Sequence, residues 1–206
     1  MLSYEQFKSQ AAGLEEYVDA TPNRRFRTIT NAIPSGSSVL DIACGSGTQL
    51  QTLAAKGCRV RGVDIAPGAV ALAKAKGLNV TLADADRFTS DSSVEKILLA
   101  DYDFVIFSKC LAYLKNKNAL MRALNTRNVI VNQRNPSYWR SKLSNIRGTA
   151  PESIIENLPY VSAEGLSIPQ TSLCALREWG ESYGFKSRVL LGNFFRSRDA
   201  VTLFYR

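Results

Sequence analysis

Residues 39–48 read Val-Leu-Asp-Ile-Ala-Cys-Gly-Ser-Gly-Thr, and this stretch decides the fold of the chain. An apolar strand runs into the acid Asp41 and then into a Gly-x-Gly turn, after which a helical pattern begins. Gly45 and Gly47 let the backbone turn sharply and leave its amides bare against a ligand. Asp64 ends the next apolar run, where it can accept hydrogen bonds from a ribose diol. The sequence therefore predicts a nucleoside-binding pocket in an α/β domain.

The spacing around the turn excludes two other nucleotide-binding motifs. A dinucleotide fingerprint has a third glycine where this chain has Leu50. A phosphate-binding P-loop ends in Gly-Lys-Ser or Gly-Lys-Thr, which is absent here. The acidic Asp41 just before the turn would repel a pyrophosphate and attract a positively charged ligand. The pattern thus favours a cationic nucleoside.

Composition fits one domain over residues 1–206. No apolar run reaches the roughly 18 residues of a membrane span, and the first residues lack a secretory signal pattern. The four cysteines are scattered without the spacing of a metal site, so we expect reduced thiols, no metal and a cytoplasmic location. These cysteines are Cys44, Cys58, Cys110 and Cys174.

The chain contains no histidine. This excludes Ser-His-Asp catalysis and histidine-containing zinc sites. A transfer reaction whose leaving group is already activated by its own charge remains compatible, because alignment then supplies much of the acceleration. A proton can leave through Tyr, Asp, Glu, Lys or water.

Strands and helices are predicted to alternate along the chain, which favours a parallel, doubly wound sheet. A helical region over residues 4–33, broken near Pro22, precedes the first strand. Residues 133–171 are too long for an ordinary connection, so we expect a cap over the substrate cleft, with a purely structural excursion as the alternative. The predicted strands are 38–43, 59–64, 79–83, 102–107, 128–132, 187–191 and 200–205, and the later helices are 67–76, 93–100, 119–126 and 173–183.

The segment 39–48 followed by Asp64 resembles motif I and its acidic partner in class I S-adenosylmethionine-dependent methyltransferases. The resemblance implies a Rossmann-like class I methyltransferase fold of the α/β class. Such a fold has a seven-stranded, mostly parallel sheet with an antiparallel last strand and helices on both faces. It also implies S-adenosyl-L-methionine as cofactor and S-adenosyl-L-homocysteine as product. The ammonium and sulfonium of that cofactor agree with the acid before the turn.

The resemblance also implies roles for individual residues. The acid and glycines of the turn would wrap the methionine portion of the cofactor. Asp64 would hold the ribose hydroxyls, and Ile65 would pack on the adenine face. After the third strand, Asp84 and the next amide would read the adenine edge, and Asp86 is an open alternative to Asp84. The end of the fourth strand would lie beside the sulfonium. The cofactor-binding candidates are Asp41, Ala43, Gly45, Gly47, Asp64, Ile65, Asp84, Ala85, Phe107 and Ser108.

Candidates for the acceptor side follow the fourth strand. Tyr113 stands where many small-molecule members of the superfamily have a histidine, and it would either orient the acceptor or act as a packing residue. We expect an N-terminal helical lid over residues 1–33 with Tyr17 in it, although core packing explains that spacing equally well. Tyr113 and Tyr17 are the catalytic candidates, and the substrate-binding candidates are Lys109, Asn135, Tyr138 and Trp139.

A second resemblance lies outside the cofactor motifs. Residues 135–143, with their Trp-Arg pair, and the later Leu-Pro-Tyr at 158–160 resemble the MetW family of methionine biosynthesis. That family has histidines in these segments, which this chain lacks. A role in homoserine acylation is therefore not carried over.

These observations predict transfer of a methyl group to an O or N atom of a small metabolite. The net charge of +8 favours an anionic acceptor. Two alternatives stay open, a MetW-like partner protein that binds an acyltransferase and an RNA methyltransferase. Nucleic acid is the less favoured partner, because the basic residues form three local clusters and no RNA-binding appendage is recognisable. We expect no membrane association, and the sequence leaves the oligomeric state and the acceptor open.

Overall fold

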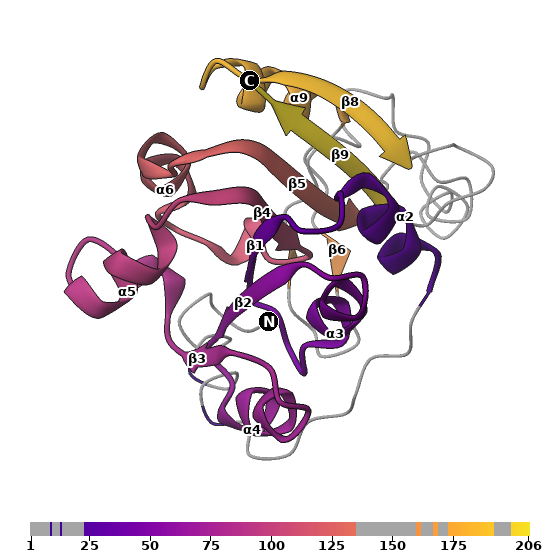
Figure 1. Ribbon diagram of the computed structural model, residues 1–206. Helices are drawn as coiled ribbons and strands as arrows, with labels where there is room; N and C mark the ends of the chain where they lie inside the picture. The colour runs from indigo at the N-terminus through magenta and orange to yellow at the C-terminus, as the bar shows by residue number, and fades with distance from the viewer. Residues whose placement is uncertain are drawn as a thin grey trace.

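The structure is a computed structural model, and it describes residues 9, 13, 23–134, 160–161, 167–168, 173–191 and 199–206. Within these residues the main feature is a seven-stranded sheet with the order β3-β2-β1-β4-β5-β9-β8 (Figure 1). Neighbouring strands from β3 to β5 run parallel, whereas β9 runs antiparallel to both β5 and β8. The expected sheet, with its last strand reversed, is confirmed. The strands are β1 (Ser38–Ile42), β2 (Arg59–Asp64), β3 (Val80–Leu82), β4 (Tyr102–Ser108), β5 (Thr126–Arg134), β8 (Lys186–Leu191) and β9 (Asp199–Tyr205).

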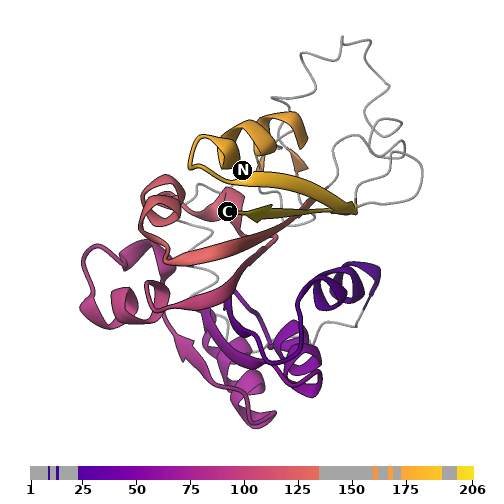
Figure 2. The ribbon, with the colours of Figure 1, turned by 45° about the horizontal axis from the view of Figure 1, so that its top comes forward.

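Helices cover both faces of this sheet, as Figure 2 shows from a second direction. One face carries α2 (Arg24–Ala32), α3 (Thr48–Ala55) and α4 (Pro67–Ala75). The other carries α5 (Ser92–Leu98), α6 (Lys117–Ala123) and α9 (Leu173–Glu181). Short 3-10 turns, η1 (Ala85–Arg87) and η2 (Leu111–Tyr113), follow β3 and β4. Among the described helices, none combines the length and apolar character needed to cross a membrane.

The alternation of side chains along the strands splits the core into two layers. In β4, Val105 and Phe107 pack with residues of α5, α6 and α9, whereas Phe104 and Ile106 pack with residues of α2 and α3. Successive side chains of a strand point to opposite faces, so an unbroken apolar run fills both layers. The position of any β4 or β5 residue along the strand therefore tells which helix layer it faces.

Helix α2 is fastened to the sheet and to α3. Ile29 and Ile33 are fully buried beneath it. The Lys56 ammonium donates to the carbonyl oxygens of Thr30, at 2.6 Å, and Ile33, at 2.5 Å, and Gln49 Nε2 donates to Thr30 Oγ1 at 2.9 Å. The described part of the expected lid over residues 1–33 is thus packed as a fixed layer, and the part before Asn23 lies almost wholly outside the described residues.

The boundaries differ from the expected ones around residue 124. The helix expected over 119–126 spans Lys117–Ala123, and Thr126 already belongs to β5. Thr126 pairs with Tyr102 of β4, and its buried hydroxyl donates to the carbonyl oxygen of Asp103 at 3.3 Å. Strand pairing thus takes over from helix propensity two residues earlier than expected.

The expected cap over residues 133–171 is described only in part. β5 continues to Arg134, and β6 (Tyr160–Val161) pairs antiparallel with β7 (Ser167–Ile168) in a small separate sheet that the sequence did not predict. The remainder of 133–171 lies outside the described residues.

Candidate functional site

Three predicted site residues meet at one edge of the sheet. β1, β2 and β4 are parallel neighbours, so the segments after their carboxyl ends lie together. Asp41 is near the end of β1, Asp64 ends β2 and Ser108 ends β4. The strand order reverses direction between β1 and β4, and in open α/β sheets ligands bind at this point of reversal.

The turn after β1 has left-handed backbone at three positions. Ala43 has φ 59°, Gly45 φ 57° and Gly47 φ 75°. Gly47 is also sterically confined, because a Cβ there would lie 2.4 Å from Leu78 Cδ1. Ala43 is exposed and adopts a conformation that non-glycine residues avoid, a kind of strain found often at ligand sites. The sequence predicted the glycines but not the strain at Ala43.

Asp64 fastens this turn to β2. Its Oδ2 atom accepts a hydrogen bond from the Gly45 amide at 2.7 Å, and its Oδ1 atom accepts one from the Ala66 amide at 2.9 Å. Each carboxylate oxygen has a second lone pair, so both remain able to accept from hydroxyl groups of a ligand. Ile65, half-buried, follows directly and is placed to pack against a ring held at Asp64.

Asp41 is the most perturbed acid of the site. It is 1% exposed, and among the described residues its Oδ1 atom has no hydrogen-bond partner. Burial, with a smaller contribution from the charge of Asp64, raises the pKa of Asp41 to about 8. Burial also raises the pKa of Asp64, although the hydrogen bonds that its carboxylate accepts from backbone amides lower that pKa in part. A pair of buried carboxyl groups with raised pKa values is well suited to a cationic ligand, which would stabilise their ionised forms.

The two cysteines beside this pair are packing residues. Burial raises the pKa of both the Cys44 and the Cys110 thiols. Cys110 Sγ donates to the carbonyl oxygen of Ile42 at 3.1 Å. Neither thiol has the lowered pKa that a reactive cysteine needs.

The turn after β3 separates the roles of two neighbouring acids. Asp84 caps η1 and accepts from the Asp86 amide at 3.0 Å. The Asp86 carboxylate accepts from the amides of Lys115, at 3.2 Å, and Asn116, at 3.0 Å. Asp86 thus holds the loop after β4, whereas Asp84 caps η1. Ala85 beside it is buried.

The residues that follow β4 differ widely in exposure. Phe107 is fully buried in the core, so only its backbone is offered to a ligand. Ser108 is half-buried, and its Oγ atom accepts from Asn132 Nδ2 at 3.1 Å. Lys109 is exposed with φ 60°, and its ammonium lies 3.3 Å from Asp199 Oδ1. Tyr113 is half-buried in η2.

Four predicted residues, Tyr17, Asn135, Tyr138 and Trp139, lie outside the described residues. Within the described part of the chain, no group of three or more His, Cys, Asp or Glu side chains is arranged to hold a metal ion.

Sequence reasoning missed Asn132, Arg25 and Asp199. Asn132 is 1% exposed, and its Oδ1 atom has no partner among the described residues. Arg25 NH1 lies 4.0 Å from Asp199 Oδ2, which brings α2 to the start of β9. The one available signal was a polar Asn at the end of the apolar run 128–132, because a buried polar residue needs a partner.

Comparison with known proteins agrees with this geometry. The family model described as "Methionine biosynthesis protein MetW" matches residues 23–190. A ubiquinone biosynthesis O-methyltransferase of Xanthomonas oryzae pv. oryzae (strain PXO99A) is 28% identical over 89 residues, which are 43% of this chain and 37% of that protein. The match thus spans well under half the length of this curated relative.

Solved structures support the same fold. The magnesium protoporphyrin IX methyltransferase of Synechocystis PCC 6803, crystallised with bound SAH, has a TM-score of 0.65 at 18% identity, covering 99% of this chain and 95% of that one. A SAM-dependent methyltransferase from Archaeoglobus fulgidus has a TM-score of 0.64 at 15% identity, with the same coverage of 99% and 95%. The fold is that of the Rossmann-like class I methyltransferases.

Proposed function

This chain belongs to the MetW family, and from that membership and its fold we propose that it transfers the methyl group of S-adenosyl-L-methionine to an O or N atom of a small, anionic metabolite. The observation that carries the proposal is the buried pair Asp41 and Asp64 around the glycine turn. The cofactor brings an ammonium and a sulfonium, and ionised buried carboxyls favour those charges strongly because water screens them little.

Each part of the cofactor has a residue suited to it. Asp41 and the turn amides would hold the methionine portion, and the second lone pairs of Asp64 would accept from the ribose hydroxyls. Ile65 would pack on the adenine, and Asp84 would read its edge. Burial of Asp64 excludes water and strengthens these hydrogen bonds.

The acceptor would lie over the end of β4. Attack on a sulfonium methyl needs alignment more than a base, which agrees with a chain that has no histidine. Tyr113 is half-buried in η2, which follows β4, and would orient the acceptor. Tyr17, Asn135, Tyr138 and Trp139 remain predictions for the same side, and so does a role of residues 133–171 as its cap.

Calorimetric titration with S-adenosyl-L-homocysteine tests the cofactor site. Asp64→Ala removes a charged acceptor of two amides and of the ribose, so we expect affinity to fall about tenfold to a hundredfold. Asp101→Ala, which removes an exposed acid before β4, is the matched control and should leave affinity unchanged. Equal affinities for both variants and the native chain would sink the site assignment.

Family membership also supports a second candidate. The family description places it in methionine biosynthesis, so the chain would act there by binding an acyltransferase. Incubation with S-adenosyl-L-methionine and a panel of small carboxylic acids, with release of S-adenosyl-L-homocysteine followed by mass spectrometry, separates the two. Turnover with a defined acceptor supports the enzyme, and its absence beside stable co-purification with an acyltransferase supports the partner protein.

A further inference from the structure

A polar cluster beside the proposed methyl site is not explained by cofactor binding. It joins the ends of β4 and β5, the start of β9 and the first turn of α2. Asn132 and Ser108 form one part, and Arg25, Lys109 and Asp199 form the other. Four segments far apart in the sequence therefore supply these five side chains.

The register places both parts in the α2 layer. Ile130 packs with Ile29 and Ile33 beneath α2, so Asn132, two residues further along β5, faces the same layer. Asn132 is paired with Val201 of β9, and Asp199 stands two residues before Val201 on the same face. Diagonal neighbours of this kind are separated by about 7–8 Å.

Two buried polar atoms of this cluster have no hydrogen-bond partner among the described residues. They are Asn132 Oδ1, an acceptor, and Arg25 Nε, a donor. Asn132 is 1% exposed, and a buried acceptor left unpaired lowers stability, so such a group in a native fold calls for an explanation. The two atoms together call for one ligand that donates at one end and accepts at the other.

Charge identifies the accepting end. Arg25 and Lys109 both lie against the single carboxylate of Asp199, at 4.0 Å and 3.3 Å. Two basic side chains therefore lie at this end of the cluster, and a carboxylate of the ligand would satisfy the unpaired Arg25 Nε donor.

The donating end lies at the methyl donor. Ile42 of β1 pairs with Phe107 of β4, so Ser108 is level with Ala43, the first residue of the cofactor turn. Asn132 Nδ2 holds the Ser108 oxygen at 3.1 Å, and Asn132 Oδ1 is left to accept from an O–H or N–H group. An acceptor O–H or N–H group that donates its proton to Asn132 Oδ1 would keep a lone pair for attack on the methyl group of the cofactor.

We propose that the acceptor is a hydroxy or amino carboxylic acid whose carboxylate binds at Arg25 and Lys109 and whose hydroxyl or amino group, held by Asn132 and Ser108, is the atom methylated. This proposal rests on the proposed function. The bond that forms joins the acceptor oxygen or nitrogen to the methyl carbon. The carbon–sulfur bond breaks, its electron pair stays on sulfur, and the acceptor proton passes to water. Asn132 and Asp199 are diagonal neighbours whose backbones lie about 7–8 Å apart, so we choose as probe an acid with a ring between its two groups rather than an α-hydroxy acid.

Three matched compounds test the proposal by calorimetry on protein saturated with S-adenosyl-L-homocysteine. 4-Hydroxybenzoate has both groups, 4-methoxybenzoate lacks the donating proton, and 4-hydroxybenzamide lacks the charge. We expect 4-hydroxybenzoate to bind, and each of the other two to bind about tenfold more weakly or worse. Equal binding of the three, or binding of none, overturns the proposal.

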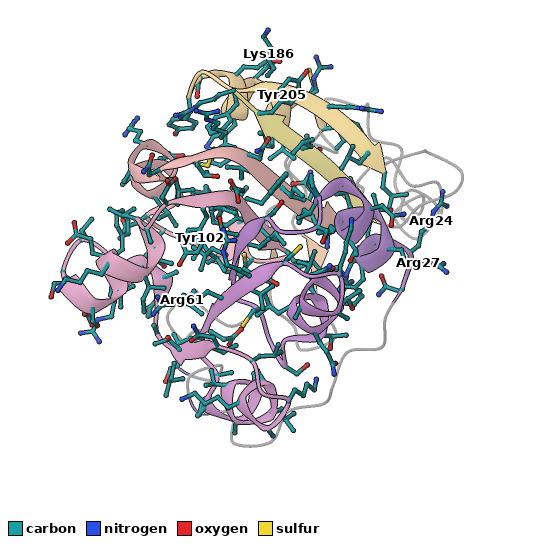
Figure 3. The ribbon with its side chains drawn as sticks, in the orientation of Figure 1. Arg24, Arg27, Arg61, Tyr102, Lys186 and Tyr205 are labelled. Atoms are coloured by element: carbon teal, nitrogen blue, oxygen red, sulfur yellow. The ribbon has the colours of Figure 1, made fainter. Side chains whose placement is uncertain are left out.

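Variants identify the two ends separately. Arg25→Gln should weaken 4-hydroxybenzoate about tenfold and leave 4-hydroxybenzamide unchanged. Arg27→Gln removes a charge from the exposed side of the same helix, visible with Arg24 in Figure 3, and should change neither. Ser108→Ala and Asn132→Leu should abolish the preference for 4-hydroxybenzoate over 4-methoxybenzoate, and unchanged discrimination in the folded Ser108→Ala protein counts against the proposal.

Retained binding of S-adenosyl-L-homocysteine shows that a variant is folded. If the native chain binds S-adenosyl-L-homocysteine but does not discriminate among the three compounds, only the acceptor class is wrong. If S-adenosyl-L-homocysteine itself does not bind, the proposed function fails, and the acceptor class fails with it.

Discussion

The proposed donor side, at the ends of β1 and β2, and the proposed acceptor side, at the ends of β4 and β5, are built in different ways. On the donor side, Asp41, the glycine turn and Asp64 come from one stretch of 24 residues, from 41 to 64. On the acceptor side, Ser108, Asn132 and Asp199 are brought together by strand pairing alone. A site formed by neighbouring residues carries a recognisable motif, and a site assembled by a sheet does not.

The largest expected effect lies on the donor side and concerns Asp41. Its pKa is about 8 in the folded protein and 3.8 as its ordinary value. Between these values the folded state binds a proton that the unfolded state has lost, so stability falls as pH rises, by up to about 1.4 kcal/mol per pH unit. Urea unfolding across this range should show that fall, and Asp41→Asn should flatten it.

The raised pKa of Asp41 also predicts how the affinity for the cofactor depends on pH. A cationic cofactor stabilises the ionised form of Asp41, so affinity for S-adenosyl-L-methionine should increase as pH rises toward about 8, and binding below that pH should release a proton. Asp41→Asn should bind without this pH dependence. Identical pH profiles for the native chain and the variant would show that Asp41 does not face the cofactor charge.

The next effect concerns the tightness of the glycine turn. Gly47 and Gly77 have nearly equal φ angles, 75° and 76°, but a Cβ at Gly47 would lie 2.4 Å from Leu78 Cδ1, whereas nothing lies within 4 Å at Gly77. Gly77→Ala therefore measures backbone strain alone, about 1–2 kcal/mol. Gly47→Ala adds a clash and should cost about 1–3 kcal/mol more, as well as cofactor affinity.

Urea unfolding and titration with S-adenosyl-L-homocysteine measure both variants. Equal losses of stability at the two glycines would show that Leu78 moves aside easily. The glycine turn would then be less rigid than we expect for a turn that holds the cofactor.

The smallest expected effect concerns Thr202 of β9, on the opposite face of the sheet from the proposed acceptor side. Thr202 Oγ1 is another buried atom without a partner among the described residues. Thr202 pairs with Val131, which belongs to the opposite core layer from Asn132. Thr202→Val keeps the shape and removes an unpaired hydroxyl, so stability should increase by about 1 kcal/mol. Binding of 4-hydroxybenzoate should be unchanged, whereas weaker binding would mean that the acceptor site is not confined to the α2 layer.

The fold could be predicted in detail because its signals are local. The apolar runs at 102–107 and 128–132 predicted strands, and the structure places β4 and β5 there. The sequence wrongly predicted helix at residue 126. Thr126 belongs to β5 because it pairs with Tyr102 of β4. Such pairing is not visible in a local pattern.

Site residues could be predicted only where a local sequence motif indicates the role of the residue. Sequence alone left Asp84 and Asp86 as alternatives, and it did not show that Asp86 accepts from the amides of Lys115 and Asn116, some 30 residues away. The role of Phe107 also changed, because its complete burial leaves only its backbone for a ligand.

The sequence by itself determined a class I methyltransferase fold and the acidic, glycine-containing turn of its donor side, because those features are encoded by neighbours along the chain. Only the tertiary structure decided that Asp41 is buried with a raised pKa, that Asn132 contacts Ser108, and that Arg25 lies beside Asp199. The physical reason is that burial and hydrogen-bond satisfaction depend on what the sheet and α2 bring into contact. Neighbours in space, unlike neighbours in sequence, exist only after the chain has folded.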